Sequence, residues 1–199
     1  RLFFDAMYEK RDSSPQDYDS NAAFITQGDN DFWGAKFDWR INDDHSLELL
    51  AFSDKSESTT DIYQYTWNTG TKDRLKGDSV AGSGGDNWSL TYTGHFSDNF
   101  TAKAMYGVNE RSASNSSNQD PDCSIVTRSG SYTSRFGQET VFEGCHPTDV
   151  GISNREDKRE AARLDFEWSL GDHLLRFGLD QEVMDSNSAV RYPNDGISY

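Results

Sequence analysis

The sequence predicts an all-β protein: an antiparallel transmembrane β-barrel segment of about seven strands, with short periplasmic turns and long extracellular loops. Three observations support this prediction. Apolar and polar residues alternate with a period of two in most segments. The connections alternate strictly between tight turns and long links. The alternating segments have roughly ten residues, the length of a strand that crosses an outer membrane.

The composition excludes several other classes of protein. Only 34% of the residues are hydrophobic, yet the chain has 12 Phe, 5 Trp and 9 Tyr. This excess of rings favours β-structure over a helical bundle and argues against disorder. The net charge of −15 argues against nucleic-acid binding, which requires a basic face. No stretch approaches the roughly 18–20 apolar residues of a membrane-spanning helix.

Each expected strand follows from its own alternation. In 160–170, a helix would place Asp165 and Ser169 on the apolar stripe, so only a strand fits. Segments 2–10 and 46–56 fit less well, because the pairs Phe3-Phe4 and Leu49-Leu50 interrupt the alternation. In chain order, we expect strands at 2–10, 32–41, 46–56, 87–96, 100–109, 160–170 and 174–184.

The connections distinguish the two ends of the expected sheet. Turn-forming residues at 42–45, 97–99 and 171–173 close tight hairpins. The links between the hairpins are 11–31, 58–85 and 112–159, which is unusual for a compact soluble domain. One end of the sheet therefore carries tight turns and the other long loops, as in outer-membrane barrels.

Aromatic residues are expected near both ends of the strands, where they would form the two interfacial girdles of a membrane barrel. Trp39, Phe96, Phe100 and Trp168 belong to the tight-turn end. Trp33, Trp88 and Tyr106 belong to the long-loop end. The opposite, charged face comprises Lys36, Asp38, Arg40, Lys103, Arg163, Asp165, Glu167, Arg176, Asp180 and Glu182. Alternation alone is also compatible with a sandwich, in which the rings fill a core and the charges face water.

Three stretches resemble the barrel of TonB-dependent outer-membrane receptors of Gram-negative bacteria. They are DFWGAKFDWRINDDHSLELLAFSDK (31–55), GGDNWSLTYTGHFSDNFTAKAMYGVN (84–109) and REAARLDFEWSLGDHLLRFGLDQE (159–182). The resemblance covers nearly the whole chain but includes no short diagnostic motif. It implies a plug domain inside a 22-stranded barrel. Since neither a plug nor a coupling box is found in these residues, we expect 1–199 to be a fragment of one barrel domain.

The resemblance also implies a function. Such a receptor resides in the outer membrane, contacts its lipid, and takes up a scarce nutrient such as a ferric siderophore, cobalamin or an oligosaccharide. Its partners are the small nutrient ligand and the TonB complex, engaged through the missing plug region. The chain opens on Arg1 without an initiator Met and stops within 195–199, which also favours a fragment.

Candidate site residues follow from this interpretation. Cys123 and Cys145 are the only cysteines, and an even count in an exported protein predicts a disulfide. Loop rings that could stack on a ligand are Tyr63, Tyr65, Trp67, Tyr132, Phe136 and Phe142, although they could equally pack the loops together. Lys103, Arg163 and Arg176 are expected to face the lumen or the plug.

No catalytic, cofactor or metal site is predicted. The four histidines lack metal-binding spacing, and His45 and His173 occupy equivalent positions in turns. The acidic residues around Asp29 and Asp31 are expected to be solvated, and 82–85 is expected to be a flexible loop rather than a phosphate-binding loop. The chain is therefore not expected to be an enzyme.

Two alternatives remain open at this stage. One is a soluble secreted β-sandwich that binds carbohydrate, in which no end of the sheet is restricted to tight turns. The other is a passive porin, which would lack a plug.

Overall fold

A computed structural model describes residues 1–18, 22–118, 125–128, 133–134, 137–138, 141–144 and 152–192. Within these residues the chain forms sixteen β-strands and no helix, so the all-β prediction is confirmed. Every strand pairing is antiparallel.

The strands differ widely in length, from 2 residues in β2 to 19 in β15 and β16. Those of the first half are β1 (Leu2–Glu9), β2 (Asp12–Ser13), β3 (Gln16–Tyr18), β4 (Ala22–Asp29), β5 (Phe32–Arg40), β6 (His45–Ser53), β7 (Ser56–Thr66) and β8 (Thr71–Gly84). Those of the second half are β9 (Asp86–Ser97), β10 (Phe100–Ser116), β11 (Ile125–Arg128), β12 (Thr133–Ser134), β13 (Gly137–Gln138), β14 (Val141–Gly144), β15 (Ile152–Leu170) and β16 (His173–Arg191). The short strands β11 and β14 pair with each other, as do β12 and β13.

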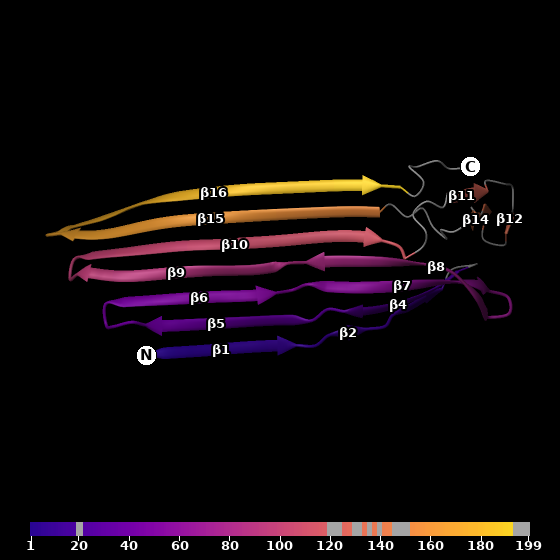
Figure 1. Cartoon of the computed structure of the whole chain (residues 1–199), viewed down its shortest axis with the longest axis horizontal. Coiled ribbons are helices and arrows are strands. Elements are labelled where there is room, and N and C mark those ends of the chain that lie inside the picture. The colour runs from indigo at the N-terminus through magenta and orange to yellow at the C-terminus, as the bar shows by residue number, and fades with distance from the viewer. Residues whose placement is uncertain are drawn as a thin grey trace.

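The other twelve strands form one sheet with up-and-down order. Short breaks divide several long strands, so that β1–β2–β3, β4–β5, β6–β7 and β8–β9 each form one continuous row across the sheet (Figure 1). The rows of β10, β15 and β16 follow in chain order. Each inner row therefore pairs with the rows before and after it in the sequence, as expected when hairpins follow one another.

The tight turns lie together at one end of the sheet, on the left in Figure 1. They occupy 42–44, 98–99 and 171–172, within the ranges that the sequence predicts. In the first turn, the Oδ1 atom of Asn42 accepts hydrogen bonds from the backbone nitrogens of Asp44 and His45, at 2.9 and 2.8 Å. Gly171 has a φ of 60°, a left-handed conformation that favours glycine.

Two expectations about the strands are wrong. The predicted strands of about ten residues are too short for β10, β15 and β16, which have 17, 19 and 19 residues. The predicted long links also contain strands: β2, β3 and β4 lie within 11–31, and 58–85 holds most of the β7–β8 hairpin. β4 opens with the continuous apolar run 22–25, and β7 and β8 are mostly polar, so none of these strands alternates clearly. Their pairing therefore left no signal in the apolar alternation.

His45 and His173 occupy equivalent positions, as expected, directly after tight turns as the first residues of β6 and β16. His45 also takes part in its turn, because its backbone nitrogen donates to Oδ1 of Asn42 and its carbonyl accepts from the backbone nitrogen of Ile41.

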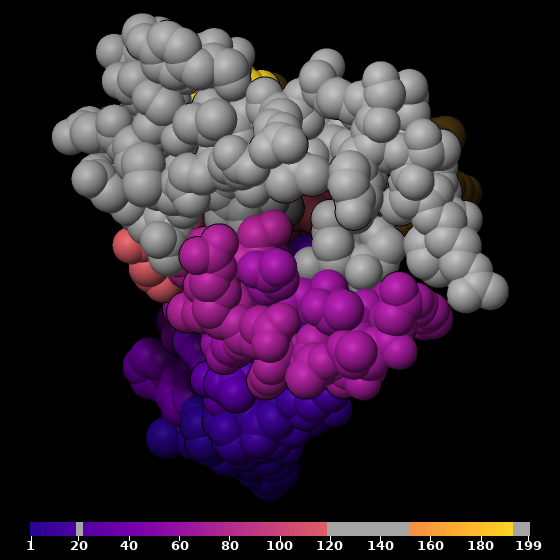
Figure 2. Space-filling view, turned by 90° about the vertical axis from the view of Figure 1, so that its right-hand side faces the viewer, coloured from indigo at the N-terminus to yellow at the C-terminus, as the bar shows by residue number. Residues whose placement is uncertain are grey.

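The sheet has almost no core. Within the described residues, the buried hydrophobic side chains are Ala22, Ala23, Ile62 and Val108. The sheet is open, and the outermost strands β1 and β16 each pair on one side only within the part of the chain that the structure describes. Figure 2 views the end opposite the tight turns, where β7 and β8 (magenta) lie in front of the first strands (indigo).

Candidate functional site

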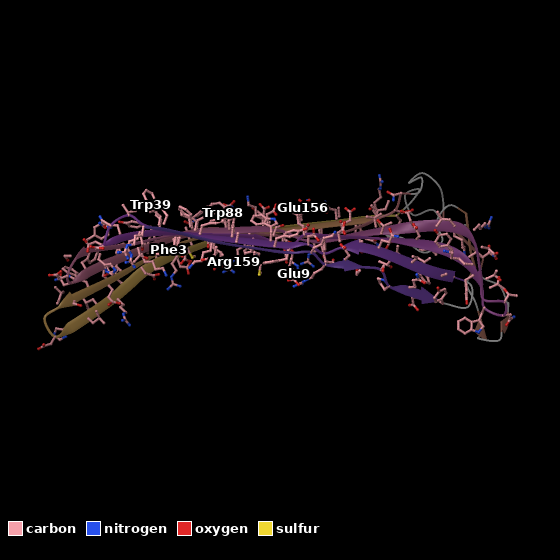
Figure 3. The ribbon with its side chains drawn as sticks, turned by 90° about the horizontal axis from the view of Figure 1, so that it is seen from below. Phe3, Glu9, Trp39, Trp88, Glu156 and Arg159 are labelled. Atoms are coloured by element: carbon pink, nitrogen blue, oxygen red, sulfur yellow. The ribbon has the colours of Figure 1, made fainter. Side chains whose placement is uncertain are left out.

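The two faces of the sheet differ sharply in chemistry. Successive side chains of a strand point to opposite faces, so the register assigns each residue to one face. One unbroken row of paired residues crosses the full width of the sheet: Leu2, Trp39, Leu47, Tyr92, Ala104, Leu164 and Leu179. We call the side that carries this row the apolar face. Figure 3 shows that the sheet is curved and that Trp39 and Trp88, which belong to the apolar face, lie on its convex side. Phe3, Glu9 and Arg159 lie on the other side of the sheet.

The apolar face is open to its surroundings. Leu179 is 72% exposed, Phe4 67% and Phe177 54%, although all three are large hydrophobic side chains. The rest of the band on this face includes Phe37, Leu49, Ala51, Leu90, Ala102, Ala162, Phe166 and Leu175. Isolated exposed apolar residues are ordinary, but a continuous exposed band marks a surface for contact with a membrane, another protein or a ligand.

Aromatic rings lie at both ends of this band. Towards the tight turns, the ring centroids of Phe96 and Phe100 are 6.1 Å apart, and those of Phe100 and Trp168 are 6.3 Å apart. His45 joins this row, with its ring 5.5 Å from that of Phe96. At the other end, Trp88 lies 5.6 Å from Tyr106. The aromatic residues predicted for the two ends of the strands therefore lie at the two ends of the apolar band, although Tyr106 lies well inside the long strand β10.

The other end of the apolar band also includes Tyr8 and Trp33, which are direct partners in the register of β1 and β5. The Tyr8 hydroxyl donates a hydrogen bond of 2.5 Å to Oδ2 of Asp31. The Tyr106 hydroxyl donates to Oε2 of Glu160 at 3.3 Å. Both rings thus belong to the apolar band, while their hydroxyl groups reach charged residues beyond it.

A charged belt follows these rings on the same face. It comprises Lys10, Asp12, Asp31, Lys55, Asp86, Glu110, Glu156, Lys158 and Glu160. Its lysines pair within the belt: Lys10 with Asp12 at 2.7 Å, Lys55 with Asp86 at 2.6 Å, and Lys158 with Glu160 at 2.9 Å. Hydrogen bonding to Glu160 raises the pKa of Lys158, and the nearby Glu110 contributes in the same direction.

The opposite side, which we call the polar face, carries all ten charged residues that the sequence predicts for it. The Nζ atom of Lys36 lies 2.9 Å from Glu48 and 3.3 Å from Asp38. Arg163 pairs with Asp165 at 2.8 Å, and Arg176 pairs with Glu167 at 2.9 Å. The sequence neighbours Phe3-Phe4 and Leu49-Leu50 interrupt the alternation, and one member of each, Phe3 and Leu50, lies on the polar face.

The three predicted basic residues of the polar face lie close together in the register. Lys103 on β10 is directly opposite Asp165 on β15, whose carboxylate pairs with Arg163. Arg176 on β16 is directly opposite Glu167. The three residues therefore form one group on neighbouring strands and on a single face.

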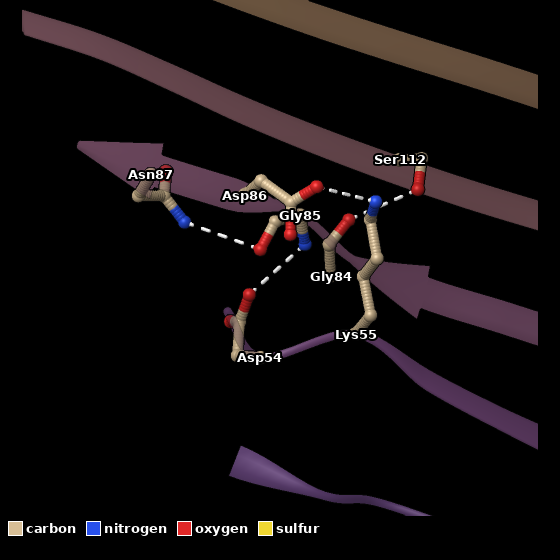
Figure 4. A network of polar contacts seen from close by, with 7 residues as sticks. All are labelled: Asp54, Lys55, Gly84, Gly85, Asp86, Asn87 and Ser112. Carbon is tan, nitrogen blue, oxygen red and sulfur yellow. Dashed lines mark hydrogen bonds and ion pairs between the residues drawn. The ribbon is translucent and has the colours of Figure 1, made fainter. Parts of the chain in front are cut away.

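A network of polar contacts fixes the break between β8 and β9 (Figure 4). The backbone nitrogen of Gly85 donates to Oδ1 of Asp54 at 2.9 Å, and the Ser112 hydroxyl donates to the carbonyl of Gly84 at 2.9 Å. A Cβ atom on Gly85 would lie 1.7 Å from the Glu110 carbonyl oxygen. The expectation of a flexible loop at 82–85 is wrong, because 82–84 belong to β8 and the backbones cross too closely for a side chain.

The ion pair beside this break has perturbed pKa values. The hydrogen bond from Lys55 lowers the pKa of the Asp86 carboxyl, and a hydrogen bond from Ser53 lowers it further. The same contact with Asp86 raises the pKa of the Lys55 ammonium group.

The structure brings some of the predicted loop rings together at the β7–β8 hairpin. The Tyr65 ring lies 6.2 Å from Trp67, and the Lys72 ammonium lies 4.2 Å from the centre of the Tyr63 ring. Tyr18 on β3 joins the cluster at 5.1 Å from Tyr65. Tyr18 was not predicted as a site residue, because no apolar alternation surrounds it and the strand β3 is too short to show one.

Several predicted residues cannot be assessed. Cys123, Cys145, Tyr132 and Phe136 lie outside the described residues, so the predicted disulfide stays a prediction. Phe142 belongs to β14, but its side chain is not described.

Two features are absent from the described residues. Within them, no group of three or more His, Cys, Asp or Glu side chains is arranged to hold a metal ion. The same part of the chain has no helix of the length and hydropathy needed to cross a membrane.

Comparisons with known proteins supply no further identification. The chain matches no protein-family model, no curated protein and no solved structure.

Proposed function

We propose that this chain forms part of the wall of an outer-membrane barrel, in a receptor that takes up a scarce nutrient with energy from the TonB complex. Its apolar face contacts lipid and its polar face lines the lumen. The observation that carries the proposal is the exposed apolar band, which is bounded at both ends by aromatic rings and followed at one end by the charged belt.

The tyrosines at the end of the band favour lipid over a second protein layer. A ring at a membrane interface keeps its apolar body in hydrocarbon and its polar group in the hydrated zone. Tyr106 and Tyr8 have this arrangement, since their hydroxyl groups reach Glu160 and Asp31 in the charged belt. The core of a sandwich would not require two rings on separate strands to be polarised in the same direction at the same end of the band.

The dimensions of the band also favour lipid. Trp88 and Phe96 lie at opposite ends of β9, eight residues apart. At about 3.4 Å per residue they are roughly 27 Å apart along the strand, or about 20 Å along the membrane normal for a tilt near 45°. With the rings included, this distance approaches the apolar height of about 25 Å found in outer-membrane barrels.

The transport part of the proposal draws on the polar face and the loop rings. The basic group of Lys103, Arg163 and Arg176 would line the passage or contact a plug. The cluster of Tyr18, Tyr65 and Trp67 lies at the end away from the tight turns, where ligand would arrive. Coupling to TonB and the classes of nutrient (ferric siderophore, cobalamin or oligosaccharide) follow from the sequence resemblance.

Tryptophan quenching tests whether the apolar face contacts lipid. The chain has 5 Trp residues, and Trp33, Trp39, Trp88 and Trp168 all lie on that face. The full-length protein would be reconstituted in vesicles whose phospholipids carry bromine on their acyl chains. We expect strong quenching that persists in Trp67→Phe. Unquenched fluorescence would contradict the proposal and favour a soluble sandwich, for which carbohydrate binding would then be measured.

Uptake by whole cells tests the transport function separately. Cells with and without the encoding gene would be supplied with labelled ferric siderophores, cobalamin and oligosaccharides. We expect the gene to be required for the uptake of one class, and a protonophore to stop that uptake. Uptake that continues without a proton gradient would indicate a passive porin.

A further inference from the structure

Most charged side chains on the polar face of β10, β15 and β16 are bound to one another. In the described part of the chain, four ion pairs lie on this strip of the sheet, each between an arginine and a carboxylate. They are Arg155–Asp157, Arg159–Glu182, Arg163–Asp165 and Arg176–Glu167. The two charges of each pair cancel, so the four pairs give the strip no net charge.

Three other charged residues of the strip are exposed and unpaired. Within the residues that the structure describes, Arg111, Lys103 and Asp180 make no side-chain hydrogen bond and no ion pair. Asp180 is directly opposite Arg163 in the register, but Arg163 pairs with Asp165 instead. The strip therefore presents two cations and one anion that a solute could bind without breaking an existing pair.

Lys103 and Asp180 lie on either side of the Arg163–Asp165 pair. The row of Lys103 on β10 continues through Asp165 on β15 to Gly178 on β16, two residues from Asp180. Two strand spacings and two residues along the strand put the Cα atoms of Lys103 and Asp180 about 12 Å apart. An unpaired cation and an unpaired anion thus lie on the same face of the sheet, across one closed ion pair.

The residues that complete these two rows leave space for a bound chain. Gly178 has no side chain beside Asp180, and Met105 on β10 completes the row of Asp180 and Arg163. A thioether side chain adapts to apolar groups of different shape. The site can therefore fix the two ends of a solute while tolerating variation between them.

The separated charges select a class of solute. A carboxylate accepts hydrogen bonds from Lys103, and an ammonium group donates them to Asp180. An extended peptide spans at most about 3.3–3.6 Å per residue, so about three residues reach across the 12 Å. A purely anionic solute would be repelled by Asp180, and a neutral sugar would leave both charges without a partner.

We propose that Lys103 and Asp180 bind the two ends of a short zwitterionic peptide as it passes along this wall. Arg111 lies eight residues from Lys103 on β10, towards the end where ligand would arrive, so the peptide carboxylate meets Arg111 first. The inference rests on the proposed function, since it assumes that the polar face lines the passage. It adds a class of nutrient to those that the sequence resemblance implies.

Saturation-transfer NMR on the full-length protein in detergent micelles measures this binding, because the method detects weak ligands. The probes are trialanine, N-acetyl-trialanine, which lacks the ammonium group, trialanine amide, which lacks the carboxylate, and maltotriose. We expect trialanine to bind about tenfold more tightly than either blocked peptide, which corresponds to one charge-assisted hydrogen bond. Maltotriose should bind more weakly still.

Variants assign each end of the peptide to one residue. Asp180→Asn should weaken trialanine about tenfold and leave N-acetyl-trialanine unchanged, because that peptide has no ammonium group to lose a partner. Lys103→Met should weaken trialanine by a similar factor and leave trialanine amide unchanged. The unchanged affinities also show that each variant is folded. Asp5→Asn is the matched control, since Asp5 lies on the polar face of β1, away from the strip, and should affect no probe.

The outcomes separate this inference from the proposed function. Equal affinity for trialanine and both blocked peptides would overturn the inference, as would variants that bind trialanine as the wild type does. If no peptide binds while the gene is required for uptake of another nutrient, the peptide site is wrong and the transport function stands. Unquenched tryptophan fluorescence in brominated vesicles would contradict the proposed function and, with it, the passage that this inference assumes.

Discussion

Trp88 and Tyr106 lie on adjacent strands of the apolar face with their ring centroids 5.6 Å apart, and the Tyr106 hydroxyl donates to Glu160. This contact marks the boundary between two environments on one face. On one side of it lie Leu90, Ala104 and Leu164, and on the other the charged belt begins. The proposed contact with lipid would require such an abrupt change from apolar to charged residues along the same strands.

The apolar face should not tolerate a charge at its centre. Leu164→Arg places a guanidinium in the middle of the band, and we expect it to lower the free energy of unfolding in vesicles by about 2–4 kcal/mol. Thr91→Arg is the matched control, because Thr91 lies on the polar face opposite Glu48 and an arginine there gains a partner. Urea unfolding of the full-length protein in vesicles measures both. Equal tolerance of the two substitutions would contradict a lipid-facing band.

The break between β8 and β9 should depend on the absence of a side chain at Gly85. An alanine Cβ there would lie 1.7 Å from the Glu110 carbonyl oxygen, and backbone cannot move away without separating β9 from β10. We expect Gly85→Ala to lower the free energy of unfolding by about 3 kcal/mol or more, at the upper end of overpacking effects. In the control Gly34→Ala, the nearest atom belongs to the Phe32 side chain at 3.4 Å, so stability should hardly change. Similar midpoints of urea unfolding for the two variants would refute this close approach.

The Lys55–Asp86 pair predicts a dependence of stability on pH. The pKa of Asp86 is lowered by its hydrogen bond from Lys55, so its contribution to stability is present above the ordinary value of 3.8. That contribution is lost as the pH falls below 3.8 and through the lower pKa that Asp86 has in the folded protein. The pKa of Lys55 is raised, so its contribution is present below 10.5 and is lost as the pH rises through the folded pKa.

Urea unfolding of the wild type, Asp86→Asn and Lys55→Met across the acid range measures this dependence. We expect both Asp86→Asn and Lys55→Met to reduce the acid loss, the second because the folded pKa of Asp86 then lies closer to its ordinary value. If the free energy of unfolding fell in parallel with pH for the wild type and for Asp86→Asn, the Asp86 carboxylate would not contribute to the pH dependence.

The apolar alternation predicted the centre of the sheet well. In 160–170 the alternate positions of Leu164, Phe166 and Trp168 all lie on the apolar face, as do Trp33 and Trp39 in 32–41. Such positions are determined locally, because a strand with one apolar face has only one register that keeps that face together. The tight turns were also predictable, since Asn42 and Gly171 have local roles in turn geometry.

The half of the sheet away from the tight turns could not be predicted from apolar alternation. β7 and β8 pair Thr59 with Val80 and Thr60 with Ser79, and neither strand has an apolar side to detect. Gly84 and Gly85 suggested flexibility in the sequence, whereas their role depends on the approach of Asp54, between β6 and β7, and of Glu110 on β10. The charged belt was missed for a similar reason, because its members come from separate rows and only the register aligns them.

Tryptophans at different positions along the strands should lie at different depths in a bilayer. Trp88 lies at the end of the apolar band near the charged belt, Trp168 lies at the end near the tight turns, and Leu164 lies between them.

Three variants would each retain a single tryptophan in this segment: Trp88, Trp168, or one introduced by Leu164→Trp with the native tryptophans replaced by Phe. Bromine near the headgroup should quench Trp88 and Trp168 most, and bromine near the end of the acyl chain should quench the Leu164→Trp variant most. In the proposed orientation the rings at the ends would lie at the interface, where their polar edges stay hydrated, whereas position 164 lies between Ala104 and Leu179 in the middle of the apolar band. The same depth profile for all three variants would mean that the band lies flat on a surface or is covered by protein, and the barrel orientation would then be wrong.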